Sequence, residues 1–295
     1  MLIEVALKLN IRGYEIPWDK FGWFYDRNMS EYYDGNYTMW TGEDDIAKTG
    51  IVTVWDENPK SVDYEGQCSE INGTTGEVWG PVPEDAETVS MFISDTCSKL
   101  TLERNGTQTV NGIKGNKYIA TEKLFDNGTK YKENACFSPG EPVPSGVRNI
   151  SECKFKAPAF ISLPHFYLAD EYYRNAVEGM KPDPENHSLY LVIEPNTGLP
   201  LHVQASVQCN LRMYQVDGID MFANVEDTMV PMIWLKVTAK IPDNDVFLLK
   251  FALAAPTIGL IVGYVLIVLG ISLLSWSIYR RKNNSKKANV FDKNI

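Results

Sequence analysis

The sequence predicts a mainly β protein of the α+β type: an antiparallel β-barrel-like ectodomain with short helices, followed by one C-terminal transmembrane helix. Two patterns lead to this prediction. Residues 201–214 alternate apolar and polar side chains, which is typical of one long β-strand with a dry apolar face and a wet polar face, the second of which includes His202. Residues 251–279 contain no charged side chain and exceed the roughly 20 residues that a helix needs to cross a bilayer.

Shorter strand patterns precede the long strand and are separated by Gly, Asn, Asp and Pro. We expect strands at 23–25, 37–42, 50–55 and 117–122. A short helix is predicted over 169–180, where Gly179 and the prolines that follow end it. The stretch 189–201 is predicted to be the hairpin partner of 201–214, with a Pro-Asn-Thr-Gly turn at 195–198.

The charge distribution divides the chain at the apolar run. Residues 1–249 hold 21 Lys and Arg against 37 Asp and Glu, a net charge of −16, whereas residues 280–295 hold 6 against 1. Because positive flanks stay cytoplasmic, we expect 1–249 to be extracellular or lumenal, 250–279 to span the membrane and 280–295 to form a basic cytoplasmic tail. A nucleic-acid binder is excluded, since the acidic part lacks clustered Lys and Arg.

The membrane helix carries a weak signal for self-association. Gly259 and Gly263 form a small-xxx-small pair, which lets a second helix approach closely. A homo-oligomer is therefore among the partners to consider.

Asn-x-Ser/Thr sequons are dense in the acidic part, where chance would supply roughly three in the whole chain. The predicted glycosylation sites are Asn28, Asn36, Asn72, Asn105, Asn127, Asn149 and Asn186. An eighth sequon, at Asn283, lies on the cytoplasmic side and should stay unmodified. Sequon density and charge asymmetry independently place residues 1–249 outside the cytosol.

The N-terminal stretch does not explain how this part crosses a membrane. Glu4, Lys8 and Arg12 interrupt anything that could serve as the apolar core of a signal peptide. We therefore expect a membrane segment upstream of this chain, in a longer protein. The alternative is that 251–279 acts as a late internal signal-anchor, which would require residues 1–249 to translocate N-terminus first.

The chain has five cysteines, an odd number, so disulfides cannot include all of them. Cys209 falls on the apolar side of the long strand and is predicted to be a buried free thiol. The other four, Cys68, Cys97, Cys136 and Cys153, permit three disulfide pairings, between which spacing cannot choose. Zinc is the rival explanation, but no pair has the two-to-four-residue spacing of a zinc knuckle, so we expect no metal.

Catalytic motifs are missing from the sequence. Its histidines, His165, His187 and His202, accompany no nucleophile elbow, zinc-protease motif or phosphate loop. The acidic run Glu43–Asp45 lacks a calcium-loop pattern and is best explained as a solvated turn. We expect neither an enzyme nor a cofactor.

Several ordered motifs carry a family resemblance: "QCSEINGTTGEVWGP", "ISDTC", "SECKFKAPAFISLPHF", "EGMKPDPENHSLYLVIEPNTGLPL" and "VPMIWL". Their order and spacing resemble the class B scavenger receptors, the fatty-acid translocase family. The resemblance extends from about Asn10 through the membrane helix. It implies a β-barrel core with a hydrophobic tunnel, and two membrane helices, of which this chain holds the second.

The resemblance also implies a disulfide pairing of Cys68 with Cys136 and of Cys97 with Cys153. Many members have one more bridge around the "CF" ahead of the Pro-rich loop, where this sequence has Cys136 alone. We therefore expect the loop 137–148 to be more mobile than in those members.

The function implied by the resemblance is that of a plasma-membrane scavenger or lipid receptor with its C-terminus in the cytoplasm. Such receptors bind fatty acids, sterols, lipoprotein particles or anionic and apoptotic debris, take part in phagocytosis, and pass apolar ligands through the tunnel towards the membrane. The alternatives within the family are a lysosomal sorting receptor and a sensory-neuron lipid or pheromone co-receptor. The tail lacks the acidic di-leucine signal of lysosomal sorting, which favours the plasma membrane.

Overall fold

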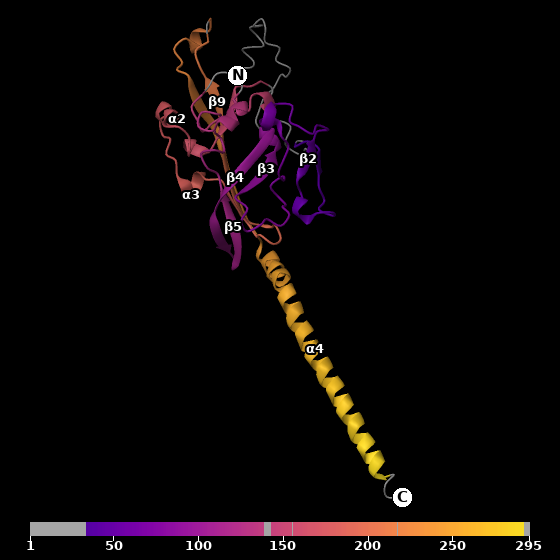
Figure 1. Cartoon of the computed structure of the whole chain (residues 1–295). Helices are drawn as coiled ribbons and strands as arrows, with labels where there is room; N and C mark the ends of the chain where they lie inside the picture. Colours follow the sequence, from indigo (N-terminus) through magenta and orange to yellow (C-terminus); the bar gives the residue numbers. More distant parts are fainter. Residues whose placement is uncertain (1–33, 139–142, 155, 217, 292–295) are drawn as a thin grey trace. The chain divides into compact units, whose positions relative to one another are not determined.

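The computed structural model describes residues 34–138, 143–154, 156–216 and 218–291, with side chains as far as Lys282. Its residues form two compact units (Figure 1). One comprises residues up to 108 together with 114–240, and the other comprises 109–113 and 241 onwards. The strand predicted at 23–25 and the sequon at Asn28 lie outside the described residues.

Antiparallel pairing dominates the first unit, which confirms the predicted architecture. Its main sheet runs in the order β3-β4-β5-β8-β9-β7-β6, and β10 pairs with β9 as well. The strands are β3 (Thr88–Ile93), β4 (Ser98–Val110), β5 (Ile113–Ile119), β6 (Arg148–Asn149), β7 (Ala159–Ser162), β8 (Tyr190–Ile193), β9 (Pro200–Met213) and β10 (Thr228–Lys240). A separate pair joins β1 (Tyr37–Met39) to β2 (Val52–Trp55). The sheet is open among these strands and does not close into the barrel that the sequence favoured.

Helices in the first unit are short. The one predicted over 169–180 is α2 (Glu171–Ala176), whose first turn is capped by the Asp170 carboxylate accepting from the Tyr172 N–H at 2.9 Å. A second is α3 (Pro184–His187), capped in the same way by Asp183. Single 3-10 turns occupy Ile46–Lys48, Gly66–Ser69, Ser94–Thr96, Lys132–Phe137, Glu152–Lys154, Pro164–Phe166 and Asp220–Phe222.

Strand β9 is the centre of the main sheet. On one edge its first half pairs with β8 and its second half with β7, so that Leu191 faces Val203 and Ile161 faces Cys209. Its other edge pairs with β10 from Met213 to His202. The long period-two pattern therefore corresponds to a strand that is bonded on both edges.

The polar face of β9 is more deeply buried than its apolar face, which is the opposite of what the apolar pattern suggests. The polar residues His202, Gln204, Ser206, Gln208 and Asn210 are all buried, whereas the apolar residues between them are half-buried. The prediction that the apolar face is dry and the polar face wet is therefore wrong.

The buried polar face is stable because its side chains have partners. The Gln204 amide donates to the carbonyl oxygens of Glu185 and Ser188 at 3.0 and 3.2 Å, and the Ser206 hydroxyl donates to the Asn186 carbonyl at 3.0 Å. Further along, the Asn210 amide donates to the Ser162 hydroxyl at 3.0 Å. An alternating sequence predicts that the two faces of a strand differ in polarity. It does not predict which face a neighbouring segment covers.

The main hydrophobic core lies on the other side of the sheet. It gathers fully buried side chains from four strands: Leu100, Leu102, Tyr118, Ile161, Leu191 and Ile193. Val203, Ala205 and Val207 of β9 pack against this core without being fully buried.

The turn from β8 to β9 lies at 195–198, as predicted. The buried Glu194 carboxylate accepts from the Thr197 N–H at 2.8 Å and from the Thr197 hydroxyl at 2.7 Å. Gly198 has a φ of 72°, and a Cβ there would lie 2.1 Å from the Trp79 carbonyl oxygen. Only glycine fits this combination of left-handed backbone and close approach.

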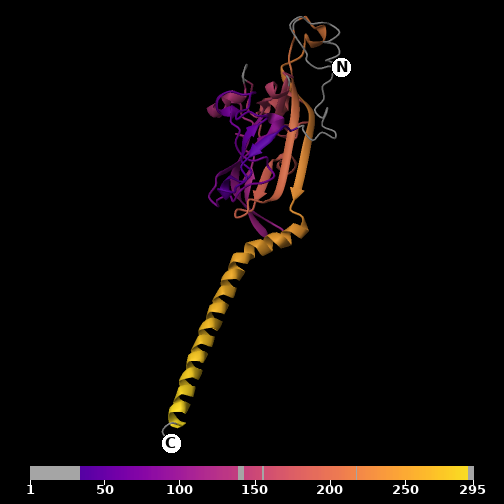
Figure 2. The same cartoon turned by 90° about the vertical axis from the view of Figure 1, so that its right-hand side faces the viewer.

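The second unit joins the tip of the β4–β5 hairpin to helix α4 (Asp243–Phe291). Asn111 and Gly112 form the tip with φ angles of 48° and 77°, the signature of a type I′ turn. The Asn111 amide donates to the Asp243 carboxylate at 3.4 Å, in the first turn of α4. Residues Asp243–Lys282 are long and apolar enough to cross a membrane, and none of the most apolar part is buried in protein. Figure 2 shows that α4 bends in its early part. Pro256 lies inside this helix and cannot donate a helical hydrogen bond, which favours a bend.

Asp126 fixes the loop that leads to the Lys132–Phe137 turn. Its fully buried carboxylate accepts hydrogen bonds from the N–H groups of Gly128, Lys130 and Tyr131 at 2.9 to 3.1 Å, and from the Ser145 hydroxyl at 2.6 Å. Burial alone would raise the pKa of Asp126, but these hydrogen bonds outweigh it and hold the pKa below its usual range.

We predict that Asp126→Asn destabilises the protein by about 3 kcal/mol at neutral pH, because buried backbone donors lose a charged acceptor. A lowered folded-state pKa gives stability that is present above the unfolded pKa near 4 and is lost as the pH falls through the folded pKa. The difference in free energy of unfolding between wild type and variant should therefore stay constant above about pH 5 and shrink below about pH 4. Denaturant titrations of the detergent-solubilised chain measure it, with Asp85→Asn, at an exposed position, as the control. A difference that grows as the pH falls would contradict the assignment.

Candidate functional site

Strands β9 and β10 share an apolar face that the described residues cover only in part. The register places Val203, Ala205, Val207 and Cys209 opposite Ala239, Val237, Leu235 and Ile233, and opposite residues of an antiparallel pair point to the same side. We call these eight residues the β9–β10 apolar face. Leu235 and Val237 are 43% and 61% exposed. An apolar surface that extends a packed core outwards is typical of a binding surface for apolar groups.

Cys209 lies on this face. It takes part in neither disulfide and is half-buried, whereas the sequence predicts a fully buried side chain. The reason is the same as for its neighbours: the apolar side of β9 is the less covered one.

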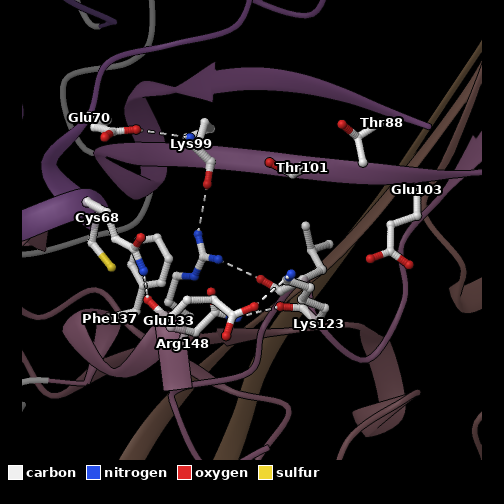
Figure 3. Close-up of a pocket in the computed structure, with 13 residues that line it drawn as sticks. Cys68, Glu70, Thr88, Lys99, Thr101, Glu103, Lys123, Glu133, Phe137 and Arg148 are labelled. Carbon is white, nitrogen blue, oxygen red and sulfur yellow. Dashed lines mark hydrogen bonds and ion pairs between the residues drawn. The ribbon is translucent and has the colours of Figure 1, made fainter. Parts of the chain in front are cut away.

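A second candidate site is a cavity of about 230 Å³ (Figure 3). Lys99, Thr101 and Glu103 of β4 form part of its lining. We call it the Arg148 pocket. Its charged lining residues are Glu70, Lys99, Glu103, Lys123, Glu133 and Arg148. Figure 3 shows the Arg148 guanidinium between the strand that carries Lys99 and Thr101 and the segments that carry Lys123 and Glu133.

Arg148 is 3% exposed and is held by neutral groups. Its guanidinium donates to the Ser98 hydroxyl and the Lys99 carbonyl, both at 3.2 Å, and to the Leu124 carbonyl at 2.6 Å. The guanidinium carbon lies 3.7 Å from the ring centre of Phe137, a cation–π contact. Burial lowers the pKa of Arg148 to about 10, so the group is still charged at neutral pH.

Two ion pairs lie at the rim of the pocket. The Lys123 ammonium is 2.8 Å from the Glu133 carboxylate, and the Lys99 ammonium is 3.4 Å from Glu70. The hydrogen bond with Glu133 raises the pKa of Lys123 and lowers that of Glu133. All four side chains are partly exposed, so these pairs position charge more than they stabilise the fold.

Both disulfides of the structure lie beside this pocket. They join Cys68 to Cys136 and Cys97 to Cys153, the pairing that the family resemblance implies. All four half-cystines cluster with Tyr64 and Phe137. The Cys68–Cys136 bridge ties the Gly66–Ser69 turn to the Lys132–Phe137 turn, and both turns line the pocket. The described part of the loop 137–148 is packed, since Phe137 and Val147 are buried.

The Cys97–Cys153 disulfide also explains a group of side chains that resembles a metal site. The ligand atoms of Asp63, Cys97 and Cys153 lie within 4.8 Å of one another, but the two sulfur atoms are bonded to each other. A thiolate is the form of cysteine that binds metals, so this group does not suit a cation.

The three histidines all have contacts within the fold. His165 and His187 stack with ring centres 4.4 Å apart, and each Nδ1 accepts a backbone N–H, from Lys181 and Asp183 respectively. His202, predicted on a wet face, is buried next to the Tyr190 hydroxyl. Burial lowers the pKa of both His187 and His202.

The predicted glycosylation sites differ in exposure. The exposed ones are Asn36, Asn72, Asn105 and Asn186, while Asn149 is half-buried. Asn127 is 7% exposed, and its amide nitrogen donates to the carbonyl oxygens of Val143 and Pro144 at 2.9 and 3.1 Å. That nitrogen is the atom a glycan would need, so the fold disfavours Asn127 as an acceptor.

Sequence reasoning missed the Arg148 pocket. Arg148 lies in a two-residue strand, and its burial depends on Phe137 and on β4, which lie outside that strand. The one local signal is "GVRNIS", a single charge among small and apolar residues just before Cys153.

Comparisons with known proteins agree on one family. A model of the CD36 family matches residues 1–281. Protein peste of Drosophila melanogaster is 34% identical over 267 residues, which make up 90% of this chain and 48% of that protein. Scavenger receptor class B member 1 of Cricetulus griseus is 34% identical over 272 residues (90% and 52%), and Lysosome membrane protein 2 of Homo sapiens is 30% identical over 253 residues (85% and 52%). The chain spans about half the length of these relatives.

We predict that Asn127 carries no glycan while Asn72 and Asn105 do. Glycopeptide mass spectrometry of protein from a eukaryotic host measures the occupancy of each site. In addition, Asn127→Ala should destabilise the fold by about 2 kcal/mol, because two buried carbonyl groups lose their donor. Asn72→Ala, at an exposed sequon, is the matched control and should change the stability little. A fully occupied Asn127 in folded protein would refute this prediction.

We predict that the double variant Cys68→Ser/Cys136→Ser loses about 4 kcal/mol of unfolding free energy, since the bridge closes a loop between residues 68 positions apart. Denaturation under non-reducing conditions tests this. The control is Cys209→Ser, which removes a thiol that takes part in neither bridge and should cost under about 1 kcal/mol. Equal midpoints for the double variant and the wild type would mean that the bridge does not constrain the native protein.

Proposed function

Because the chain belongs to the CD36 family, we propose that it is a cell-surface receptor that binds lipids, lipoproteins or apoptotic and anionic particles and passes apolar ligands towards the membrane. The family includes scavenger receptors, the chain has a helix suited to a membrane, and its first unit contains two disulfides. We further propose that residues 1–249 lie outside the cell and that 280–295 lie in the cytoplasm.

The β9–β10 apolar face is the observation that supports this function best. It continues the main core outwards along two long strands, and its side chains are aliphatic apart from Cys209. An acyl chain lying on this face would be shielded from water on the side that contacts it, and each CH₂ group fully removed from water is worth about 0.8 kcal/mol. No reactive group is needed, because the ligand is moved and not transformed.

Sorting to lysosomes is the second candidate, since one relative is named Lysosome membrane protein 2. Residues 280–295 hold no acidic di-leucine signal, which favours the plasma membrane. Labelling of surface proteins with a membrane-impermeant reagent separates the two locations: recovery of the protein in lysosomes alone would support the second one.

We predict that Val237→Glu lowers uptake of a fluorescent long-chain fatty acid about tenfold, because a carboxylate on the apolar face must be desolvated when the acyl chain binds. Thr238→Glu is the matched control: the next residue of the same strand is also exposed but points to the opposite face. Uptake is measured in cells with equal surface amounts of each variant. Equal loss in both variants, or in neither, would remove the apolar face from the mechanism.

A further inference from the structure

A groove crosses the polar side of the main sheet. One side chain from each of five neighbouring strands lines it: Asn105 of β4, Lys117 of β5, Tyr190 of β8, Gln204 of β9 and Lys236 of β10. The strand register puts the last four on the same face, opposite the main core. The groove has a volume of about 550 Å³, within the roughly 300–1,000 Å³ of pockets that hold small organic ligands. We call it the α3 groove, because residues of α3 line it as well.

The lining of the α3 groove suits a neutral polar ligand. Its charged residues have both signs, since two lysines and one glutamate line it. The Lys117 ammonium lies 4.5 Å from the centre of the Tyr190 ring, and the Lys236 ammonium lies 3.1 Å from the Asn186 Oδ1. Ammonium groups held by neutral partners can still donate to hydroxyl and amide oxygens. A sugar ring has apolar C–H and polar O–H groups, and the rings of Tyr167 and Tyr190 beside these donors match both.

Two of the lining residues are themselves sequon asparagines, Asn105 and Asn186. The Asn186 side chain is fixed in position, because its amide nitrogen donates to the Asp183 carboxylate at 2.5 Å while its oxygen accepts from Lys236. A side-chain amide has two hydrogens, and an N-linked glycan replaces one of them. Asn186 can therefore carry a sugar and keep both contacts, whereas the amide nitrogen of Asn127 donates to two carbonyl groups.

We infer that the α3 groove holds the first sugar residues of an N-glycan carried by Asn186. This glycan is then a part of the folded structure that lies across the polar face of the sheet, and it fills the groove against free ligands. The inference rests on the proposal that residues 1–249 lie outside the cell, because only there would Asn186 be glycosylated. It does not depend on the β9–β10 apolar face, which lies on the other side of β9.

Native deglycosylation of the full chain, made in a eukaryotic host and kept in a non-ionic detergent, tests the inference. A peptide N-glycosidase removes the glycans, and glycopeptide mass spectrometry follows each site. We expect Asn186 to lose its glycan at least about fivefold more slowly than Asn36 and Asn72, because its linkage must first leave the groove. Both control residues are exposed and lie outside the groove lining. After denaturation the rates at the three sites should be equal.

Three outcomes would overturn the inference. The first is equal rates in the native protein, and the second is a difference that persists after denaturation, which would come from the local sequence alone. The third is an Asn186 without a glycan in protein that carries one at Asn72. Absence of glycans from every sequon would overturn the extracellular placement together with the inference, so the two failures can be told apart.

Two lysines on the same face of β10 provide matched variants. Lys236 and Lys240 are both exposed, but Lys236 lines the groove and contacts Asn186, whereas Lys240 lies outside the lining. Lys236→Ala should speed native deglycosylation at Asn186 about threefold, because one contact that holds the linkage is lost. Lys240→Ala should leave that rate unchanged, and neither variant should change the rate at Asn36. Equal rates at Asn186 in the two variants would overturn the inference.

Discussion

Pairing on both edges of β9 is the constraint on which the rest of the first unit depends. Its backbone bonds to β7 and β8 on one side and to β10 on the other, so its register is fixed along nearly its whole length. A slip of one residue would exchange the two faces of the strand and bury Val207 where Gln208 now lies. The same ladder of backbone hydrogen bonds therefore determines which side chains form the apolar face. It also determines which polar side chains meet their hydrogen-bond partners.

The burial of the polar face has a structural purpose. Gln204, Ser206 and Asn210 bind α3, the residues after it and β7 by hydrogen bonds that have direction, whereas aliphatic contacts do not. Each such bond contributes only about 1 kcal/mol, but a misplaced partner would leave buried polar groups unsatisfied. These side chains consequently specify one arrangement of the 184–188 segment and leave the opposite face of β9 available for apolar contacts.

Much of this fold was predictable from patterns within single segments. The period of two over 201–214, the turn at 195–198 and the uncharged run at 251–279 each have a local physical cause, and the structure has the corresponding strand, turn and helix. Features that arise between segments were not predictable. Strand β4 was missed because its second half, from Glu103 to Thr109, is polar and largely exposed, and β10 because its pattern includes Pro231 and several exposed apolar residues. The burial of Arg148 has only a weak local signal, since it results from contacts with Phe137 and with Ser98 of β4, outside its own two-residue strand.

The outer edge of β10 has a consequence for how the molecule behaves among copies of itself. Among the described strands β10 pairs only with β9, so its other edge presents backbone donors and acceptors beside exposed aliphatic side chains. Such an edge is a template for intermolecular strand addition and aggregation. Lys236 and Lys240 place positive charges along the strand that repel an identical edge. This protection is electrostatic, so it weakens as salt screens the lysines.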